Sequence, residues 1–261
     1  MTTIVATDLD RTLIYSPRAV GETASPLVVV ERHDGEDASY MTEAAAQRYS
    51  RLHENAIIVP VTTRVPLQWE RVQLPGPSSR YAITTNGAIL LVNGEVDHEW
   101  SEHVAVQLAG VAPLTEIWDH VAHVCRPEWT VKLRNARGLF CYAVLHRKRV
   151  PDGFYDECAA WAAARGWRTS TQGRKLYWVP RPLTKSAAVA EVAARVGATT
   201  VLAAGDSLLD LDLVRDAHRA IVPAHGELVL SGWAAPHVDV TVATGVMAGE
   251  EIVDWFAKLI D

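Results

Sequence analysis

Three features are scarce in this sequence, and each scarcity excludes a class of protein. Cysteine accounts for only 3 of the 261 residues; the three lie far apart with no CxxC pair, so neither a disulfide framework nor a zinc site is expected. Positive charge is also scarce, and the formal net charge of -6 argues against nucleic acid as a partner. No apolar run approaches membrane-spanning length and no leader-like segment opens the sequence, so we expect a cytoplasmic protein without a membrane partner.

Apolar sequence, in contrast, is abundant and is arranged in short runs. Hydrophobic residues make up 49% of the chain, which is enough for a substantial core. The runs alternate with segments of helical periodicity, a pattern typical of a parallel sheet with crossover helices on its faces. We expect strands at 4–6, 56–61, 81–84, 201–204, 220–222 and 238–242. Helices are expected at 42–53, 185–196 and 249–259.

The pattern changes between residues 90 and 180. Asn93-Gly94 predicts a hairpin turn, and one long helix is expected from Ser101 to about Val124. Further strands are expected at 130–133, 139–145 and 176–179, with a helix at 152–165. We therefore predict an α/β core domain of residues 1–89 and 181–261 and an inserted α+β domain of residues 90–180.

A second hairpin is expected nearer the start of the chain. Asp34-Gly35 lies between two strand-like runs in LVVVERHDGEDASYM, and this dipeptide favours a tight turn. Because the hairpin follows the loop after the first strand, we expect it to form a flap over the edge of the sheet.

Polar residues stand directly after the ends of several predicted strands. They are Asp8 and Asp10 after the first strand, Thr62, Thr63 and Arg64 after the second, Asp206, Ser207 and Asp210 after VLAAG, and Lys185 at the start of the helix leading into that strand. In open α/β sheets, ligands bind at the carboxyl ends of the strands. Several carboxylates at one edge repel each other, and Mg²⁺, which prefers oxygen ligands, would relieve that repulsion.

These parts indicate phosphoryl-transfer chemistry. A carboxylate can attack phosphorus to give an aspartyl phosphate when a metal and nearby cationic or hydroxyl donors offset the repulsion between the two anions. We predict Asp8 as the nucleophile, Thr62 and Lys185 as the clamp on the phosphoryl group, and Asp10 as the general acid and base. Each piece alone has an ordinary alternative, such as a capping aspartate or a solvated lysine. Their order along the chain favours the catalytic interpretation.

Five motifs in this order resemble those of the haloacid dehalogenase superfamily of phosphatases. They are DLDRTL, VTTR, TNGAIL, LTKSAAVAEVA and GDSLLDLDL. The sequence is most similar to the type IIB members, which include Cof-type and sucrose-phosphatase-like enzymes. The resemblance implies a Rossmann-like core with helices on both faces of a parallel sheet, and an α+β cap of the C2B type at residues 90–180.

The activity implied by this resemblance is that of a magnesium-dependent phosphatase. Its substrate would be a small phosphorylated metabolite, such as a sugar phosphate. Two alternatives stay open: a phosphomutase of the phosphomannomutase type, and a catalytically silent binding protein on the same fold. The oligomeric state is left open as well.

The resemblance also implies roles for individual residues. Asp8 would be both nucleophile and metal ligand, Asp10 would place its backbone carbonyl on the metal, and Asp206 and Asp210 would complete the metal site. Substrate binding is expected from Arg11, Thr63, Arg64, Asn86, Lys132 and Arg134. The last two of these share one face of a predicted cap strand.

Three positions depart from the family pattern. Arg11 and Thr63 replace glycines, and Leu209 replaces an asparagine next to Asp210. Glycine tolerates a positive φ and leaves room beside a phosphate, whereas arginine penalises that backbone conformation and fills the space. We expect Arg11 to keep an ordinary φ and to point outward, where its planar guanidinium would bind a second anionic group of the substrate.

Overall fold

The computed structural model describes residues 2–260 and divides into two compact units. The first unit contains the described residues up to Asp97 and those from Thr184 onward, and the second is His98–Leu183. The second unit begins later than the predicted boundary at residue 90, because β6 (Ile89–Val92) and β7 (Glu95–Val96) pair in a sheet with β5 (Tyr81–Thr84) of the first unit. The function of the second unit as a cap stays a prediction.

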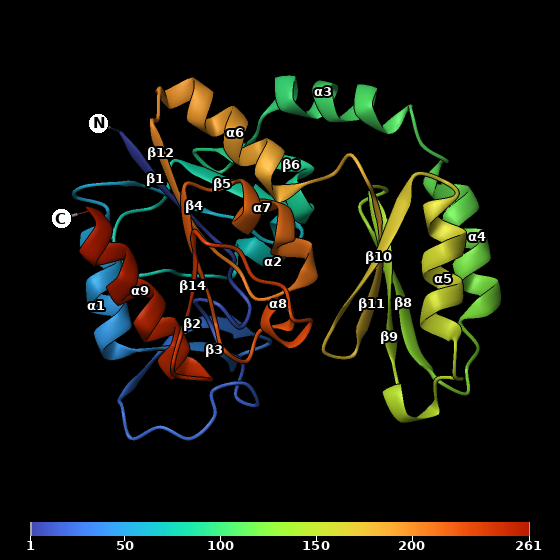
Figure 1. Cartoon of the computed structure of the whole chain (residues 1–261), viewed down its shortest axis with the longest axis horizontal. Helices are drawn as coiled ribbons and strands as arrows, with labels where there is room; N and C mark the ends of the chain where they lie inside the picture. Colours follow the sequence, from blue (N-terminus) through green and yellow to red (C-terminus); the bar gives the residue numbers. More distant parts are fainter. Residues whose placement is uncertain (1, 261) are drawn as a thin grey trace. The chain divides into compact units, whose positions relative to one another are not determined.

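A five-stranded parallel sheet forms the centre of the first unit (Figure 1). Its strand order is β14-β13-β12-β1-β4. The bounds are β1 (Thr3–Thr7), β4 (Ile57–Pro60), β12 (Thr200–Ala204), β13 (Arg219–Val222) and β14 (Val238–Val240). The predicted parallel sheet is confirmed. The predicted strand at 81–84 is β5, which contacts this sheet through a parallel bridge between Val61 and Ile83 and also pairs antiparallel with β6.

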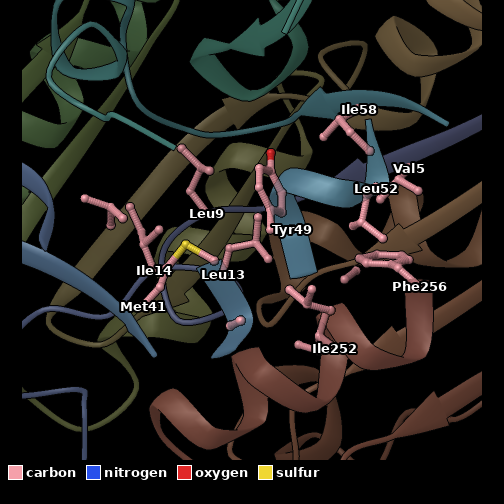
Figure 2. Packing of buried hydrophobic residues seen from close by; sticks show 14 of the residues in the cluster. Val5, Leu9, Leu13, Ile14, Met41, Tyr49, Leu52, Ile58, Ile252 and Phe256 are labelled. Carbon is pink, nitrogen blue, oxygen red and sulfur yellow. The ribbon is translucent and has the colours of Figure 1, made fainter. Parts of the chain in front are cut away.

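Helices cover both faces of this sheet, as predicted. On one side lie α1 (Glu43–Leu52) and α9 (Val246–Ile260), and on the other α6 (Lys185–Val196) and α7 (Leu211–Asp216) (Figure 1). Figure 2 shows the core on the first side, where buried residues from β1, β4, α1 and α9 pack together: Val5, Ile58, Leu52, Ile252 and Phe256. Side chains along a strand point alternately to its two faces, so Val5 points toward this core and the residues before and after it in β1 point toward the other face.

Two of these helices begin at threonine caps. The side chain of Thr42 accepts a hydrogen bond from Ala45 N at 3.1 Å, and that of Thr184 accepts one from Ala187 N at 3.2 Å. Such caps satisfy backbone donors that the first helical turn leaves unpaired. Helix α6 ends at Gly197, whose φ of 62° is a left-handed conformation suited to glycine.

The predicted hairpin is confirmed as β2 (Leu27–His33) and β3 (Glu36–Thr42). Its turn residues Asp34 and Gly35 have φ values of 54° and 82°, which match the favoured two-residue hairpin turn. The pairing register shifts on both sides of Glu31. Such irregularities turn a side chain away from its regular strand direction.

The second unit is a four-stranded antiparallel sheet of order β10-β11-β9-β8 with helices packed against it. Its strands are β8 (Thr130–Ala136), β9 (Phe140–Leu145), β10 (Trp167–Gln172) and β11 (Lys175–Pro180). Its helices are α3 (His98–Leu108), α4 (Leu114–Val124) and α5 (Phe154–Ala163). His120 of α4 stacks on Trp161 of α5 with 3.6 Å between ring centroids, which joins the two helices.

One expectation for this unit is wrong, and one of its strands was not predicted. The single helix predicted from Ser101 to Val124 is divided into α3 and α4, since Pro113 cannot continue a helix and disfavours helical backbone in the residue before it. Strand β10 was not predicted, because most of its residues after Trp167 are small and polar.

Short helical segments complete the described part of the chain. They are α2 (Pro66–Trp69), α8 (Glu227–Leu230) and the 3-10 turns η1 (Thr85–Gly87), η2 (Arg147–Arg149) and η3 (Leu208–Asp210). Within residues 2–260, no helix combines the length and apolar character needed to cross a membrane. The three cysteines are buried, and none forms a disulfide.

Candidate active site

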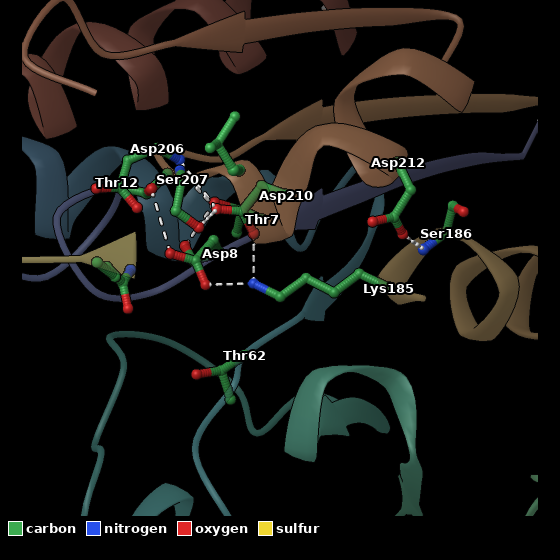
Figure 3. Close-up of polar contacts among 12 residues, drawn as sticks. Thr7, Asp8, Thr12, Thr62, Lys185, Ser186, Asp206, Ser207, Asp210 and Asp212 are labelled. Atoms are coloured by element: carbon green, nitrogen blue, oxygen red, sulfur yellow. Dashed lines mark hydrogen bonds and ion pairs between the residues drawn. The ribbon is translucent and has the colours of Figure 1, made fainter. Parts of the chain in front are cut away.

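Three aspartates meet at the carboxyl ends of β1 and β12. Asp8 directly follows β1, and Asp206 and Asp210 come shortly after β12. Because these two strands are parallel neighbours, their ends lie at the same edge of the sheet. Each aspartate is buried and offers one carboxylate oxygen, and these three oxygens lie within 4.8 Å of one another (Figure 3). We call these three residues the acidic cluster.

Lys185 places a buried ammonium group between two of these carboxylates. Its Nζ donates to Asp8 Oδ1 at 2.6 Å and to Asp210 Oδ1 at 2.5 Å (Figure 3). Lys185 is the first residue of α6, and Gly87 lies close to the backbone of the residue before it. A Cβ atom on Gly87 would lie 2.2 Å from the carbonyl oxygen of Thr184. Any larger residue at position 87 would therefore displace the backbone next to Lys185.

Burial dominates the electrostatics of the acidic cluster. Burial, reinforced by the charge of Asp210, raises the pKa of Asp8 to about 7, although Lys185 acts in the opposite direction. Burial and the charge of Asp8 raise the pKa of Asp206 well above its usual value. For Lys185, burial alone would lower the pKa, but Asp210 and Asp8 outweigh it and the pKa is raised. The ionised forms of Asp8 and Asp206 are therefore disfavoured in this site, and a further cation would favour them.

The loop after β12 orients Asp210. Its Oδ2 accepts hydrogen bonds from the backbone N of Asp206 at 3.2 Å, from the backbone N of Ser207 at 2.9 Å and from the Ser207 hydroxyl at 2.8 Å. Leu209, where the resemblance leads one to expect asparagine, is buried. Asp210 is therefore held by its own loop and by Lys185 without that asparagine.

Arg11 differs from our expectation in both backbone and side chain. Its φ is 66°, and its Nε lies 3.1 Å from Asp206 Oδ2. His225 holds this arrangement: Arg11 Nη2 donates to the His225 carbonyl at 3.1 Å, and His225 Nε2 lies 3.0 Å from the Arg11 carbonyl. The expected ordinary φ and outward orientation are thus wrong, because contacts with Asp206 and His225 stabilise the left-handed conformation. Binding of a second substrate anion by Arg11 stays a prediction.

Asp10 is paired with Arg64. Arg64 Nε donates to Asp10 Oδ2 and Arg64 Nη2 to Asp10 Oδ1, both at 2.8 Å. The same guanidinium donates to Glu31 Oε2 at 2.9 Å. The catalytic role of Asp10 and the contact of its backbone carbonyl with a metal stay predictions, as does substrate binding by Arg64.

The remaining predicted residues fall in two places. Thr62 is buried after β4, where its hydroxyl accepts the backbone N–H of Arg64 at 3.1 Å and its carbonyl accepts that of Asn86 at 2.9 Å. Thr63, beside it, is half-buried. Lys132 and Arg134 are exposed on β8 of the second unit. The catalytic role of Thr62 and the substrate-binding roles of the others stay predictions.

The comparisons with known proteins rest on structure rather than on sequence. No family model matches the chain, and neither does any curated protein. Among solved structures, the sucrose-phosphatase of Synechocystis sp., in complex with sucrose and phosphate, has a TM-score of 0.69 at 14% identity, covering 98% of each chain. A sugar phosphatase of haloacid dehalogenase subclass IIB has a TM-score of 0.60 at 13% identity, covering 99% of each chain. The chain has the haloacid dehalogenase fold. A haloacid dehalogenase-like hydrolase from B. subtilis agrees, with a TM-score of 0.62 at 13% identity over 98% of each chain.

Within the haloacid dehalogenase fold, this chain has two residues near the acidic cluster and Asp10 that the sequence did not reveal. Glu31 contacts Arg64, and His225 contacts Arg11. The only sequence signal for Glu31 was its position directly after the apolar run LVVV. For His225, nothing in the sequence indicated the contact with Arg11, because it joins positions 214 residues apart.

Proposed function

We propose that this chain is a magnesium-dependent phosphatase that hydrolyses a small phosphorylated metabolite through an aspartyl phosphate on Asp8. The observation that supports this most directly is the buried Lys185 ammonium between Asp8 and Asp210, beside Asp206. This arrangement combines a nucleophilic oxygen, a fixed positive charge for phosphoryl oxygens and surplus negative charge for a metal.

The donor set of the acidic cluster suits magnesium. It consists of carboxylate oxygens, the hard ligands that Mg²⁺ prefers. Burial, reinforced by the neighbouring carboxylates, raises the pKa values of Asp8 and Asp206, and a bound cation would favour their ionised forms. Asp8 and Asp206 would hold the ion together with the backbone carbonyl of Asp10, and Asp210 would support them. When bound, the ion neutralises charge on the phosphoryl group and on the attacking carboxylate.

The proposed reaction has two steps. In the first, an Asp8 carboxylate oxygen attacks phosphorus while the bond to the leaving oxygen breaks, and Asp10 donates a proton to that oxygen. In the second, water attacks the aspartyl phosphate, Asp10 accepts a proton from the water, and the bond between phosphorus and Asp8 breaks to release inorganic phosphate. Lys185 and Thr62 would hold the phosphoryl oxygens in both steps.

A sugar phosphate is the substrate class we propose. The support comes from two structural neighbours, a sucrose-phosphatase and a sugar phosphatase. Lys132 and Arg134 alternate with other residues along β8, so that they can bind polar or anionic groups from one strand face.

Phosphate release from a panel of sugar phosphates and p-nitrophenyl phosphate, with Mg²⁺ and with EDTA, tests the proposal. We expect release that requires Mg²⁺. Turnover only in the presence of an added sugar bisphosphate would favour a mutase. Calorimetric binding of panel members without any turnover would favour the silent binding protein.

A further prediction concerns Arg11 and the metal. Replacing Arg11 with glycine removes a cation that lies 3.1 Å from Asp206 Oδ2. It also removes backbone strain, because a φ of 66° costs a non-glycine residue about 1–2 kcal/mol. We expect Arg11→Gly to bind Mg²⁺ about tenfold more tightly, equivalent to about 1.4 kcal/mol. Isothermal titration calorimetry with MgCl₂ alone measures this, and Arg18→Gly, at an exposed turn, is the control. Unchanged affinity would mean that Arg11 and the metal share Asp206 without competition.

A further inference from the structure

The β2–β3 hairpin carries a buried carboxylate that the proposed reaction does not use. The Glu31 side chain is 4% exposed. Its Oε2 accepts from the Ser39 hydroxyl at 2.7 Å, and its Oε1 accepts from Arg71 Nε at 3.2 Å. The shifts in register on both sides of Glu31 set this residue apart from the regular pairing of the hairpin. A buried charge of this kind is costly unless it is fully paired.

Arg64 connects this carboxylate to Asp10. One edge of its planar guanidinium donates two hydrogen bonds of 2.8 Å to Asp10. Another edge faces Glu31, with Nη2 donating to Oε2 and Nη1 near Oε1, both at 2.9 Å. Two-point contacts between arginine and carboxylate fix orientation as well as charge. Because carboxylates contact two edges of the Arg64 guanidinium, the plane of that group is fixed. The fixed plane in turn sets the orientation of the Asp10 carboxylate.

We propose that Glu31 is a positioning residue that, through Arg64, holds the Asp10 carboxylate where it transfers a proton to the leaving group. This inference rests on the proposed phosphatase function. The Asp10 side chain is 40% exposed while Arg64 is 13% exposed, so a substrate can reach Asp10 without displacing the arginine. Arg64 donates to both Asp10 oxygens, so during proton transfer one of these hydrogen bonds would open to let its oxygen carry the proton while the other maintains the orientation of Asp10.

The proposal predicts an effect that depends on the leaving group. Phenyl phosphate and p-nitrophenyl phosphate have similar shapes, but phenolate is the poorer leaving group and needs proton donation more. A well-placed general acid contributes about 10²–10⁴-fold to rate, and misplacement forfeits part of this. We expect Glu31→Gln to lower kcat for phenyl phosphate by about tenfold or more, to lower kcat for p-nitrophenyl phosphate by less than about twofold, and to leave both KM values nearly unchanged.

Two further variants separate positioning from folding. Arg71→Gln removes another ion pair of Glu31 but leaves the contact between Arg64 and Asp10, so both kcat values should stay close to wild type. Arg64→Lys keeps the positive charge but loses the planar fork, and it should reproduce the selective loss on phenyl phosphate. A crystal structure of Glu31→Gln should show the two-point contact between Arg64 and Asp10 broken.

The outcomes distinguish this inference from the proposed function. Equal losses on both substrates, or an unchanged contact between Arg64 and Asp10 in the crystal structure of Glu31→Gln, would overturn the positioning role while the phosphatase function stands. Absence of hydrolysis of either substrate by the wild-type protein with Mg²⁺ would overturn the function and this inference with it.

Discussion

Replacing Asp8 with asparagine is expected to lower phosphate release by about 10³-fold or more, because the amide cannot form the phosphoryl-enzyme bond. The change is nearly isosteric, and the site keeps Lys185, Asp206 and Asp210. Release from p-nitrophenyl phosphate with Mg²⁺ measures the effect. Asp212→Asn is the matched control, since Asp212 is also a buried aspartate but accepts from Ser186 N, outside the acidic cluster; its activity should be close to wild type.

The same substitution has a second expected result, on stability. Burial and the neighbouring Asp210 raise the pKa of Asp8 from 3.8 to about 7 in the folded chain. The folded state therefore binds the proton more tightly than the unfolded state, and ionising Asp8 weakens folding as the pH rises from about 3.8 to about 7. Asparagine carries no charge, so Asp8→Asn should have an unfolding temperature at pH 8 in EDTA that is equal to or higher than that of the wild type.

Together, the two results identify the role of Asp8. A variant that is inactive but at least as stable as the wild type has lost chemistry, not structure. Activity close to wild type would exclude Asp8 as the nucleophile. A lower unfolding temperature at pH 8 would contradict the electrostatic account, whatever the activity.

The acidic cluster was predictable because it follows from local patterns. Short apolar runs define the strands, and Asp8 and Asp206 stand just after two of them, so placing the strands side by side also brings these carboxylates together. Lys185 could be placed for a similar reason: it begins a segment of helical periodicity that leads into β12. The residues that local signals place are therefore those at the ends of regular elements.

The orientation of Arg11 and the contacts of Glu31 were not predictable in this way. The left-handed backbone of Arg11 opposes local preference, and it is stabilised by His225 and Asp206, both far away in the sequence. Glu31 is directed toward Arg64 in a hairpin whose register is irregular at this residue, a feature that residue alternation cannot reveal. In both cases distant tertiary contacts, rather than local propensity, determine the conformation.

Replacing Lys185 with methionine is expected to cause the largest loss of stability. The side chain of Lys185 is 1% exposed and lies between the carboxylates of Asp8 and Asp210. Methionine fills similar space but leaves both carboxylates without that cation. Removing one partner of a buried ion pair costs about 3–5 kcal/mol. Urea unfolding at pH 8 in EDTA should show a loss of this size, whereas Lys258→Met, at an exposed position of α9, should show almost none.

A double variant tests whether this loss is electrostatic. Adding Asp210→Asn to Lys185→Met removes one of the two uncompensated carboxylates, so the double variant should be more stable than Lys185→Met alone. Mg²⁺ should stabilise Lys185→Met more than the wild type, because the cluster then has greater surplus negative charge and binding to the folded state raises its stability. Additive losses in the double variant, or equal stabilisation by Mg²⁺, would show that Lys185 acts through packing. If both expectations hold, charge balance at the carboxyl ends of β1 and β12 links the stability of the fold to occupancy of the metal site.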